Sequence, residues 1–187
     1  MKVLGAVLAG GVSRRFGADK AESPLGGTAM LDRVLDVLRP QVADLVVCGR
    51  PWREARFLPD RPAAQLGPLG GLCAALHDAR LHSLDAVVCA PVDVHPLPAD
   101  LVELLAGDLP IVIAEQHSVG LWPVWCLAAL ETYLQNGGRS IYGWIAASGA
   151  RRANLAVGPL VNINFPADIH DYRAVCWSRD TRDWKRP

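Results

Sequence analysis

The chain has 187 residues, enough for one compact domain with a sizeable core. Its 19 basic and 19 acidic residues give a formal net charge of zero, which argues against a nucleic-acid or membrane surface, so an anion site would need a local concentration of charge. No apolar run approaches the roughly 20 residues of a membrane-spanning helix, and the five cysteines form no C-x-x-C pair. We expect a soluble, cytoplasmic protein with reduced thiols.

Strand and helix patterns alternate along the chain. In order, they predict a strand at 2–9, a helix at 29–38, a strand at 44–48, a helix at 71–81, a strand at 85–90, a helix at 98–106, a strand at 110–114, and helices at 126–135, 139–148 and 168–175. The strands are apolar without alternation, as in parallel sheets covered on both faces. This predicts an α/β fold, Rossmann-like and doubly wound, with a mostly parallel sheet and helices on both faces. A single domain would span residues 1–175, followed by a charged tail at 176–187.

The first predicted strand leads directly into a loop rich in glycine and arginine, Leu8-Ala-Gly-Gly-Val-Ser-Arg-Arg-Phe-Gly-Ala-Asp-Lys20. Such a loop can present backbone N–H groups and fixed positive charge to a polyphosphate. Its spacing is neither that of a P-loop nor that of a dinucleotide fingerprint. The alternative is a glycine-rich turn with solvated arginines. The pattern L-A-G-G-x-S-x-R-x-G-x-D-K resembles the signature loop of the molybdenum cofactor guanylyltransferases, within the nucleotidyltransferases of Rossmann-like fold.

The resemblance implies roles for this loop. Backbone contact with the nucleotide is assigned to Leu8, Ala9, Gly10 and Gly11, because small residues allow close approach. Arg15 would hold the outer phosphates, and Lys20 would reach the phosphate under attack, where an ammonium neutralises charge developing in the transition state. Asp19 is expected to orient the loop rather than to bind metal.

A second segment, Cys89-Ala-Pro-Val-Asp-Val-His-Pro-Leu-Pro98, follows a predicted buried strand. Its Asp93 is well placed to ligate Mg²⁺ beside a triphosphate, since Mg²⁺ takes one or two carboxylates and fills its remaining positions with phosphate oxygens and water. The family pattern here is C-D-x-P, from which Val94 departs. The alternative is that Asp93 caps the next helix.

A third segment, Leu58-Pro-Asp60 with Gln65-Leu-Gly-Pro-Leu-Gly-Gly71, is similar to the family's D…G-P-L-x-G stretch. A carboxylate can accept hydrogen bonds from both N1–H and the N2 amine of guanine, so Asp60 is the candidate purine reader, with Gly67 and Pro68 lining the base pocket. The alternative is that Asp60 is a plain turn residue. The family's Asn at the end of the second strand, a further base contact, is Cys48 here, and Gly49 and Arg50 are candidates to compensate.

A fourth segment, Leu160-Val-Asn-Ile-Asn-Phe-Pro166, is similar to the family's N-[IV]-N-T-P-E stretch, from which Phe165 departs. The resemblance implies that Asn162 and Asn164 contact the acceptor substrate or metal-bound water. Arg139, upstream, is a candidate partner for the phosphate of a pterin substrate. The alternative for these residues is a role in turns and helix caps.

Other conspicuous side chains favour structural interpretations. The histidines lack the spacing of a zinc site. Arg50, Arg53 and Arg56, at helical spacing, are expected on a solvated face. For Trp122, Trp125 and Trp144, packing in the core or at the surface is favoured over a role in supporting a flat pterin ring.

Taken together, the resemblance implies transfer of GMP from GTP to the terminal phosphate of Mo-molybdopterin, with release of pyrophosphate and Mg²⁺ as cofactor. Proteins of molybdenum cofactor biosynthesis, or the acceptor enzymes, are candidate partners. One alternative is a related cytidylyl or sugar-phosphate nucleotidyltransferase, because the fold does not determine the acceptor. Another is a catalytically inactive nucleotide-binding module in cofactor transfer, which the departures at Cys48, Val94 and Phe165 keep open.

Overall fold

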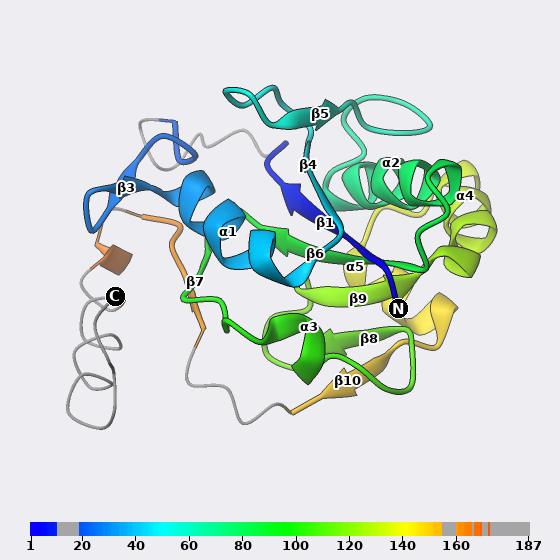
Figure 1. Ribbon diagram of the computed structural model, residues 1–187. Coiled ribbons are helices and arrows are strands. Elements are labelled where there is room, and N and C mark those ends of the chain that lie inside the picture. The colour runs from blue at the N-terminus through cyan, green and yellow to red at the C-terminus, as the bar shows by residue number, and fades with distance from the viewer. Residues whose placement is uncertain (11–18, 155–159, 166, 170–171, 173–187) are drawn as a thin grey trace.

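A seven-stranded sheet in the order β10-β8-β9-β6-β1-β4-β5 forms the centre of the molecule (Figure 1). The computed structural model describes residues 1–10, 19–154, 160–165, 167–169 and 172. The strands are β1 (Val3–Leu8), β4 (Asp44–Cys48), β5 (Arg56–Leu58), β6 (Ala86–Pro91), β8 (Ile111–Ile113), β9 (Gly120–Pro123) and β10 (Arg151–Ala153). Strand β9 pairs antiparallel with β6 and β8, whereas the other neighbours in this sheet pair in parallel. The predicted mostly parallel α/β sheet is confirmed.

Helices cover both faces of the sheet. They are α1 (Met30–Leu38), α2 (Pro68–Leu81), α3 (Leu101–Leu104), α4 (Leu127–Gln135) and α5 (Ile141–Ser148), with short 3-10 turns η1 (Arg39–Gln41) and η2 (Val124–Cys126). Two small antiparallel pairs lie outside the main sheet: β2 (Pro24–Leu25) with β3 (Thr28–Ala29), and β7 (Val94–His95) with β11 (Val161–Asn162). Within the described part of the chain, no helix combines the length and the apolar character needed to cross a membrane.

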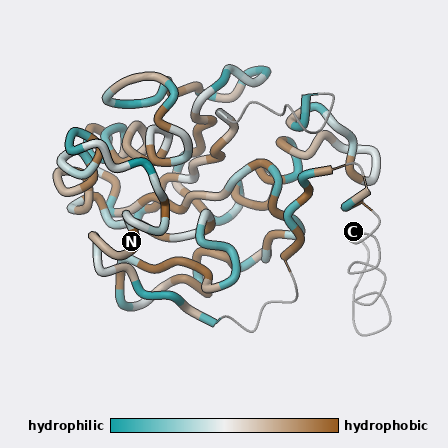
Figure 2. Tube along the Cα trace, turned by 180° about the vertical axis from the view of Figure 1, so that it is seen from behind, coloured by the Kyte–Doolittle hydropathy of each residue, from teal (hydrophilic) through white to brown (hydrophobic). Residues whose placement is uncertain are grey.

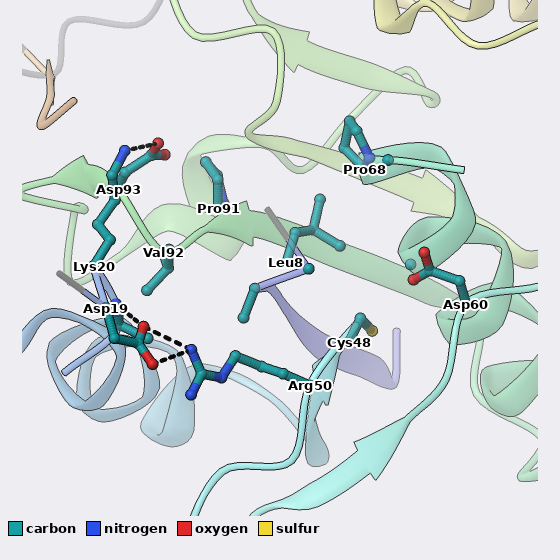
Figure 3. A pocket seen from close by; sticks show the side chains of 15 residues that line it. Leu8, Asp19, Lys20, Cys48, Arg50, Asp60, Pro68, Pro91, Val92 and Asp93 are labelled. Atoms are coloured by element: carbon teal, nitrogen blue, oxygen red, sulfur yellow. Dashed lines mark hydrogen bonds and ion pairs between the residues drawn. The ribbon is translucent and has the colours of Figure 1, made fainter. Parts of the chain in front are cut away.

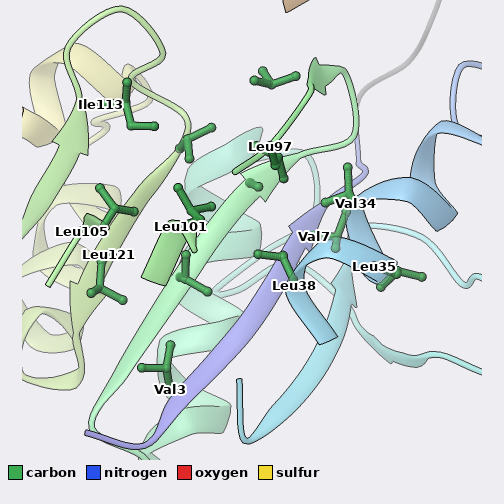
Figure 4. Packing of buried hydrophobic residues seen from close by; sticks show 14 of the residues in the cluster. Val3, Val7, Val34, Leu35, Leu38, Leu97, Leu101, Leu105, Ile113 and Leu121 are labelled. Carbon is green, nitrogen blue, oxygen red and sulfur yellow. The ribbon is translucent and has the colours of Figure 1, made fainter. Parts of the chain in front are cut away.

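The core forms because successive strand residues point to opposite faces of the sheet. In β1, Val3 and Val7 pack with α1 and α3 in one cluster, part of which Figure 4 shows, whereas Leu4 and Ala6 pack with α2, α4 and α5 in another. Both faces are therefore buried, which explains why the strand is apolar throughout. Figure 2 shows the same distribution, with hydrophobic residues along the inner strands and hydrophilic ones on the surrounding loops.

Several sequence expectations need correction. The helix predicted at 98–106 is reduced to α3, and Asp100, expected inside it, is its N-cap residue without a side-chain cap bond. Strands β5, β9 and β10 were not predicted, because each is short and none reads as a long apolar run. Most of the helix predicted at 168–175 and all of the tail at 176–187 lie outside the described residues.

The arginines expected on one solvated helical face instead lie on a turn and a strand, with separate partners. Arg56, on β5, donates from Nη1 to Asp78 Oδ1 at 2.7 Å and from Nη2 to Asp78 Oδ2 at 2.8 Å and to Asp44 Oδ2 at 2.5 Å. These contacts join β5 to β4 and to the buried face of α2, and the hydrogen bond to Asp78 raises the pKa of the Arg56 guanidinium. Arg53, in contrast, is 66% exposed and pairs with Asp32.

Removing the Arg56 charge would leave the buried Asp78 carboxylate without its bidentate partner. We expect Arg56→Gln to lower the free energy of unfolding by about 1–3 kcal/mol, because an unpaired buried acceptor is costly. Arg53→Gln removes an exposed pair and is expected to change it by less than about 0.5 kcal/mol. Urea unfolding of both variants measures the difference, and equal effects would contradict a structural role for the Arg56 pair.

Candidate active site

A cavity of about 240 Å³ opens at the carboxyl ends of β1, β4 and β6, beside the first turn of α2 (Figure 3). Ligands of such sheets bind at this edge. The lining residues are Leu8, Ala9, Gly10, Asp19, Lys20, Ala21, Cys48, Arg50, Asp60, Gly67, Pro68, Gly71, Pro91, Val92 and Asp93. The structure thus brings together, in one pocket, the described residues of the predicted nucleotide site. Gly11 and Arg15, also predicted there, lie outside the described residues.

The ends of β1 and β4 meet backbone to backbone at the pocket. Ala9 N donates to Cys48 O at 2.9 Å, which joins β1 to β4, and Gly49 N donates to Leu58 O of β5 at 3.1 Å. Gly49 has a φ of 90°, and a Cβ atom there would lie 2.4 Å from Gly10 Cα. Glycine is therefore required at position 49 both by its conformation and by the close approach of Gly10.

Lys20 joins three separate parts of the chain at one end of the pocket. Its Nζ donates to Asp93 Oδ2 at 3.0 Å and to Asn164 Oδ1 at 3.0 Å. Ile163 N in turn donates to Asp93 O at 2.8 Å, which holds the Asn164 segment against the Asp93 loop. The side chains of Lys20 and Asp93 are 11% and 21% exposed, so the ion pair is largely withdrawn from water. A cation and a carboxylate of this kind are suited to phosphate chemistry.

Asp19 and Arg50 form a second ion pair at the pocket wall. Arg50 Nη1 lies 2.6 Å from both Oδ1 and Oδ2 of Asp19, and Oδ1 also accepts from Ala21 N at 3.0 Å. The predicted orienting role of Asp19 agrees with this geometry. The sequence offered Arg50 both as a replacement base contact beside Cys48 and as part of a solvated face. The structure places it in the pocket lining, but its partner is Asp19, which sequence reasoning missed.

The opposite end of the pocket is formed by Asp60, Cys48 and the first turn of α2. A Cβ atom at Gly70 would lie 3.0 Å from Asp60 Cγ, and one at Gly71 would lie 2.9 Å from Cys48 Cβ, so these glycines let the helix approach closely. Burial raises the pKa of Asp60, and hydrogen bonds from the backbone N–H groups of Leu66 and Gln65 lower it by less. Burial also raises the pKa of the Cys48 thiol far above its usual range, so this group stays protonated and is no nucleophile.

The residues predicted to bind the acceptor are placed differently from one another. Asn164 touches Lys20, whereas Asn162 is exposed on β11, paired with Val94 of β7. Arg139 does not line the pocket. Its Nη1 donates to Leu134 O at 2.8 Å and to Gly138 O at 2.6 Å, between α4 and α5, so this placement does not support its predicted role.

The tryptophans divide between core and surface. Trp122 and Trp144 are buried with ring centroids 5.8 Å apart, whereas Trp125 is exposed. The favoured packing interpretation is therefore confirmed for Trp122 and Trp144.

His95 is also buried, and burial lowers its pKa to about 4, so it is neutral at physiological pH.

The donor set at Asp93 fits a magnesium ion shared with a phosphate ligand. Asp93 Oδ2 accepts from Lys20, and Oδ1 has no hydrogen-bond partner among the described residues. The same part of the chain holds no group of three or more His, Cys, Asp or Glu side chains that could enclose a metal. A single carboxylate beside a polyphosphate is the usual protein contribution to a Mg²⁺ site, because this ion keeps water and phosphate oxygens as ligands.

Comparison with known proteins agrees with the fold. Residues 5–151 match the family model described as MobA-like NTP transferase domain. A molybdenum cofactor guanylyltransferase of Cereibacter sphaeroides is 37% identical over 182 residues, covering 90% of this chain and 94% of the relative. One from Rhodobacter capsulatus is 33% identical over 179 residues, with the same coverage. The crystal structure of molybdopterin-guanine dinucleotide biosynthesis protein A from Archaeoglobus fulgidus has a similar fold, with a TM-score of 0.71 at 22% identity over 94% of this chain and 99% of that one.

The contact between Gly49 and Gly10 can be tested with a matched pair of glycine variants. Gly137 has a φ of 84°, but nothing lies within 4 Å of a Cβ atom there, so Gly137→Ala measures the backbone strain alone. We expect that variant to cost about 1 kcal/mol of unfolding free energy. Gly49→Ala adds a clash with backbone and is expected to cost clearly more, and also to weaken nucleotide binding. Thermal unfolding and calorimetric titration measure the two effects, and equal losses in both variants would contradict the close contact.

Proposed function

Because the chain belongs to the MobA-like NTP transferase family, we propose that it transfers GMP from GTP to the terminal phosphate of Mo-molybdopterin, releasing pyrophosphate and forming molybdopterin guanine dinucleotide. The observation that carries this proposal is the polarity of the pocket. Lys20 and Asp93 lie at one end and Asp60 lies at the other, beyond Leu8 and Cys48 (Figure 3). A nucleotide can therefore place its phosphates beside Lys20 and Asp93 and its base beside Asp60.

At the base end, the Asp60 carboxylate selects guanine. It can accept from N1–H and from the N2 amine together, a pair of adjacent donors that adenine and cytosine lack. The first turn of α2, with Gly67 and Pro68, lines the same end of the pocket. Cys48, for which the resemblance to the family pattern implies an asparagine, offers only a weak thiol donor. Asp60 accordingly carries most of the base recognition in this chain.

At the phosphate end, an oxygen of the molybdopterin phosphate attacks the α-phosphorus of GTP in line. The new P–O bond forms as the bond from the α-phosphorus to the oxygen bridging to the β-phosphorus breaks, and pyrophosphate leaves with that electron pair. Lys20 Nζ stabilises the negative charge that builds up on the phosphoryl oxygens. The resemblance assigns Arg15 to the outer phosphates.

Asp93 would hold Mg²⁺, which supplies neutralisation of charge on the phosphate oxygens. In this arrangement Asp93 has two tasks, since Oδ2 also accepts the hydrogen bond that directs Lys20. Asn164 holds the same ammonium from the other side, so it sets the direction of Lys20 whether or not it contacts the acceptor. The chain thus provides orientation and electrostatic stabilisation without a covalent intermediate.

A variant of Lys20 distinguishes an enzyme from an inactive nucleotide-binding module. We expect Lys20→Ala to lower kcat for guanylyl transfer by about 100- to 1000-fold, because it removes charge stabilisation in the transition state, while GTP still binds. Release of pyrophosphate from GTP and Mo-molybdopterin measures kcat, and calorimetry measures binding. Lys2→Ala, at the exposed start of the chain, is the control. Unchanged function of Lys20→Ala in the cell would favour the module, and unchanged kcat would contradict the role of Lys20 in the transition state.

Asp60 tests the choice of nucleotide. We expect wild-type protein with Mg²⁺ to bind GTP more tightly than CTP or ATP, and Asp60→Asn to lose at least about tenfold in GTP affinity because one guanine donor faces an amide N–H₂. Affinity for CTP and ATP should change little. Asp100→Asn, at the start of α3, is the control. Equal wild-type affinity for the three nucleotides would contradict guanine recognition and favour the inactive nucleotide-binding module.

A further inference from the structure

The dipeptide Gly49-Arg50, directly after β4, touches the two described ends of the glycine-rich loop at 8–20. Gly49 packs against the backbone of Gly10, two residues beyond β1, and Arg50 pairs with Asp19, where the described chain resumes. Lys20 is the next residue. One short segment after β4 therefore contacts Gly10, near the start of the loop, and Asp19, which immediately precedes the catalytic lysine.

The Asp19 carboxylate organises the turn that carries Lys20. Its Oδ1 accepts from Ala21 N at 3.0 Å, while the Asp19 carbonyl accepts from Ser23 N at 3.1 Å and from Ser23 Oγ at 2.9 Å. Lys20 lies inside this turn. Since the carboxylate bonds on one side to the turn and on the other to Arg50, its position links the two.

Stability does not explain the Asp19–Arg50 pair. The two side chains are 34% and 31% exposed, and ion pairs with this degree of exposure contribute little to folding. Arg50 is nevertheless held in place. Its guanidinium carbon lies 5.6 Å from the centre of the Trp52 ring, which is buried and donates from Nε1 to Asp32 at 2.8 Å. A side chain held by a ring beneath it and an anion at its tip is suited to fixing a position.

We infer that Arg50 is a positioning residue for guanylyl transfer, acting on Lys20 through Asp19. This rests on the proposed function, since Lys20 is the group whose direction matters for the reaction. Arg50 Nη1 holds the Asp19 carboxylate, the carboxylate holds the turn, and the turn aims Lys20 at Asp93 and the phosphates. A direct contact of Arg50 with phosphate is the competing arrangement, and the two differ in their kinetic signatures.

The test is a double-mutant cycle on Asp19 and Arg50. We expect Arg50→Gln to lower kcat by about ten- to a hundredfold, because a small displacement of a catalytic group is costly, with KM for GTP changed less than about threefold. Asp19→Asn should have a similar effect, and the double variant should be no worse than either single one. Since only Nη1 touches Asp19, Arg50→Lys is expected to restore much of kcat.

The matched control is Arg53→Gln, whose guanidinium lies 5.3 Å from the same Trp52 ring but pairs with Asp32. It should leave kcat within about twofold of wild type. Melting temperatures check that the variants are folded. Additive losses with a raised KM for GTP would overturn the inference in favour of direct phosphate binding, and an Arg50→Gln effect no larger than that of the control would also overturn it.

Amide exchange separates this inference from the proposed function. In the protein without substrates, Arg50→Gln should speed deuterium exchange in the 19–23 turn, whereas Arg53→Gln should not. If wild-type protein transfers no guanylyl group to Mo-molybdopterin, the proposed function fails while the exchange result still decides whether Arg50 positions the turn. Unchanged exchange in that turn would overturn the positioning role even in an active enzyme.

Discussion

The register of the central strands is the constraint on which the site depends. In the parallel pairing of β1 with its neighbours, Leu8 lies level with Cys48 of β4 and with Pro91 of β6. The chain therefore leaves all three strands at one line, and the loops that follow must meet there. A shift of one residue in either pair would turn inward-facing side chains to the other face and separate the loops. The buried side chains on both faces, from α1 and α3 and from α2, α4 and α5, oppose such a shift.

The pocket carboxylates show how one residue type takes on different tasks. Asp93 is paired with Lys20, Asp19 with Arg50, and Asp60 with backbone N–H groups alone. The cationic side chains of the described pocket are thus committed to ion pairs with Asp93 and Asp19, whereas Asp60 keeps a carboxylate without a cationic partner among the described residues. A protein with zero formal net charge obtains a polarised site in this way, through placement rather than through an excess of one sign.

The sequence was sufficient for the central strands and for most of the nucleotide pocket, for different reasons. β1, β4 and β6 are buried on both faces, so their apolar runs are distinctive. Leu8, Ala9, Gly10, Lys20 and Asp93 were recognisable from motifs that follow such strands, and Asp60 from its motif before the helix α2. The short strands β5, β9 and β10 carry too few residues for a periodic signal.

The sequence did not predict which groups the arginine side chains would contact. Arg50 could have been solvated, and it pairs with Asp19 only because the segment after β4 meets the end of the glycine-rich loop. Arg139 had the right charge for a phosphate, yet it satisfies carbonyl oxygens between α4 and α5. Contacts of this kind depend on which distant segments become neighbours in space, which local patterns do not specify.

The hydrogen bond from Lys20 to Asn164 spans 144 positions of the chain. During synthesis, the glycine-rich loop and its lysine leave the ribosome long before Asn164 does, whereas a domain folds as a unit. Until that late segment docks, the ammonium lacks one of the oxygens that direct it. The lysine that we propose to be catalytic would therefore be aligned only when the last part of the fold has docked, so a chain cut short before Asn164 would lack a complete active site.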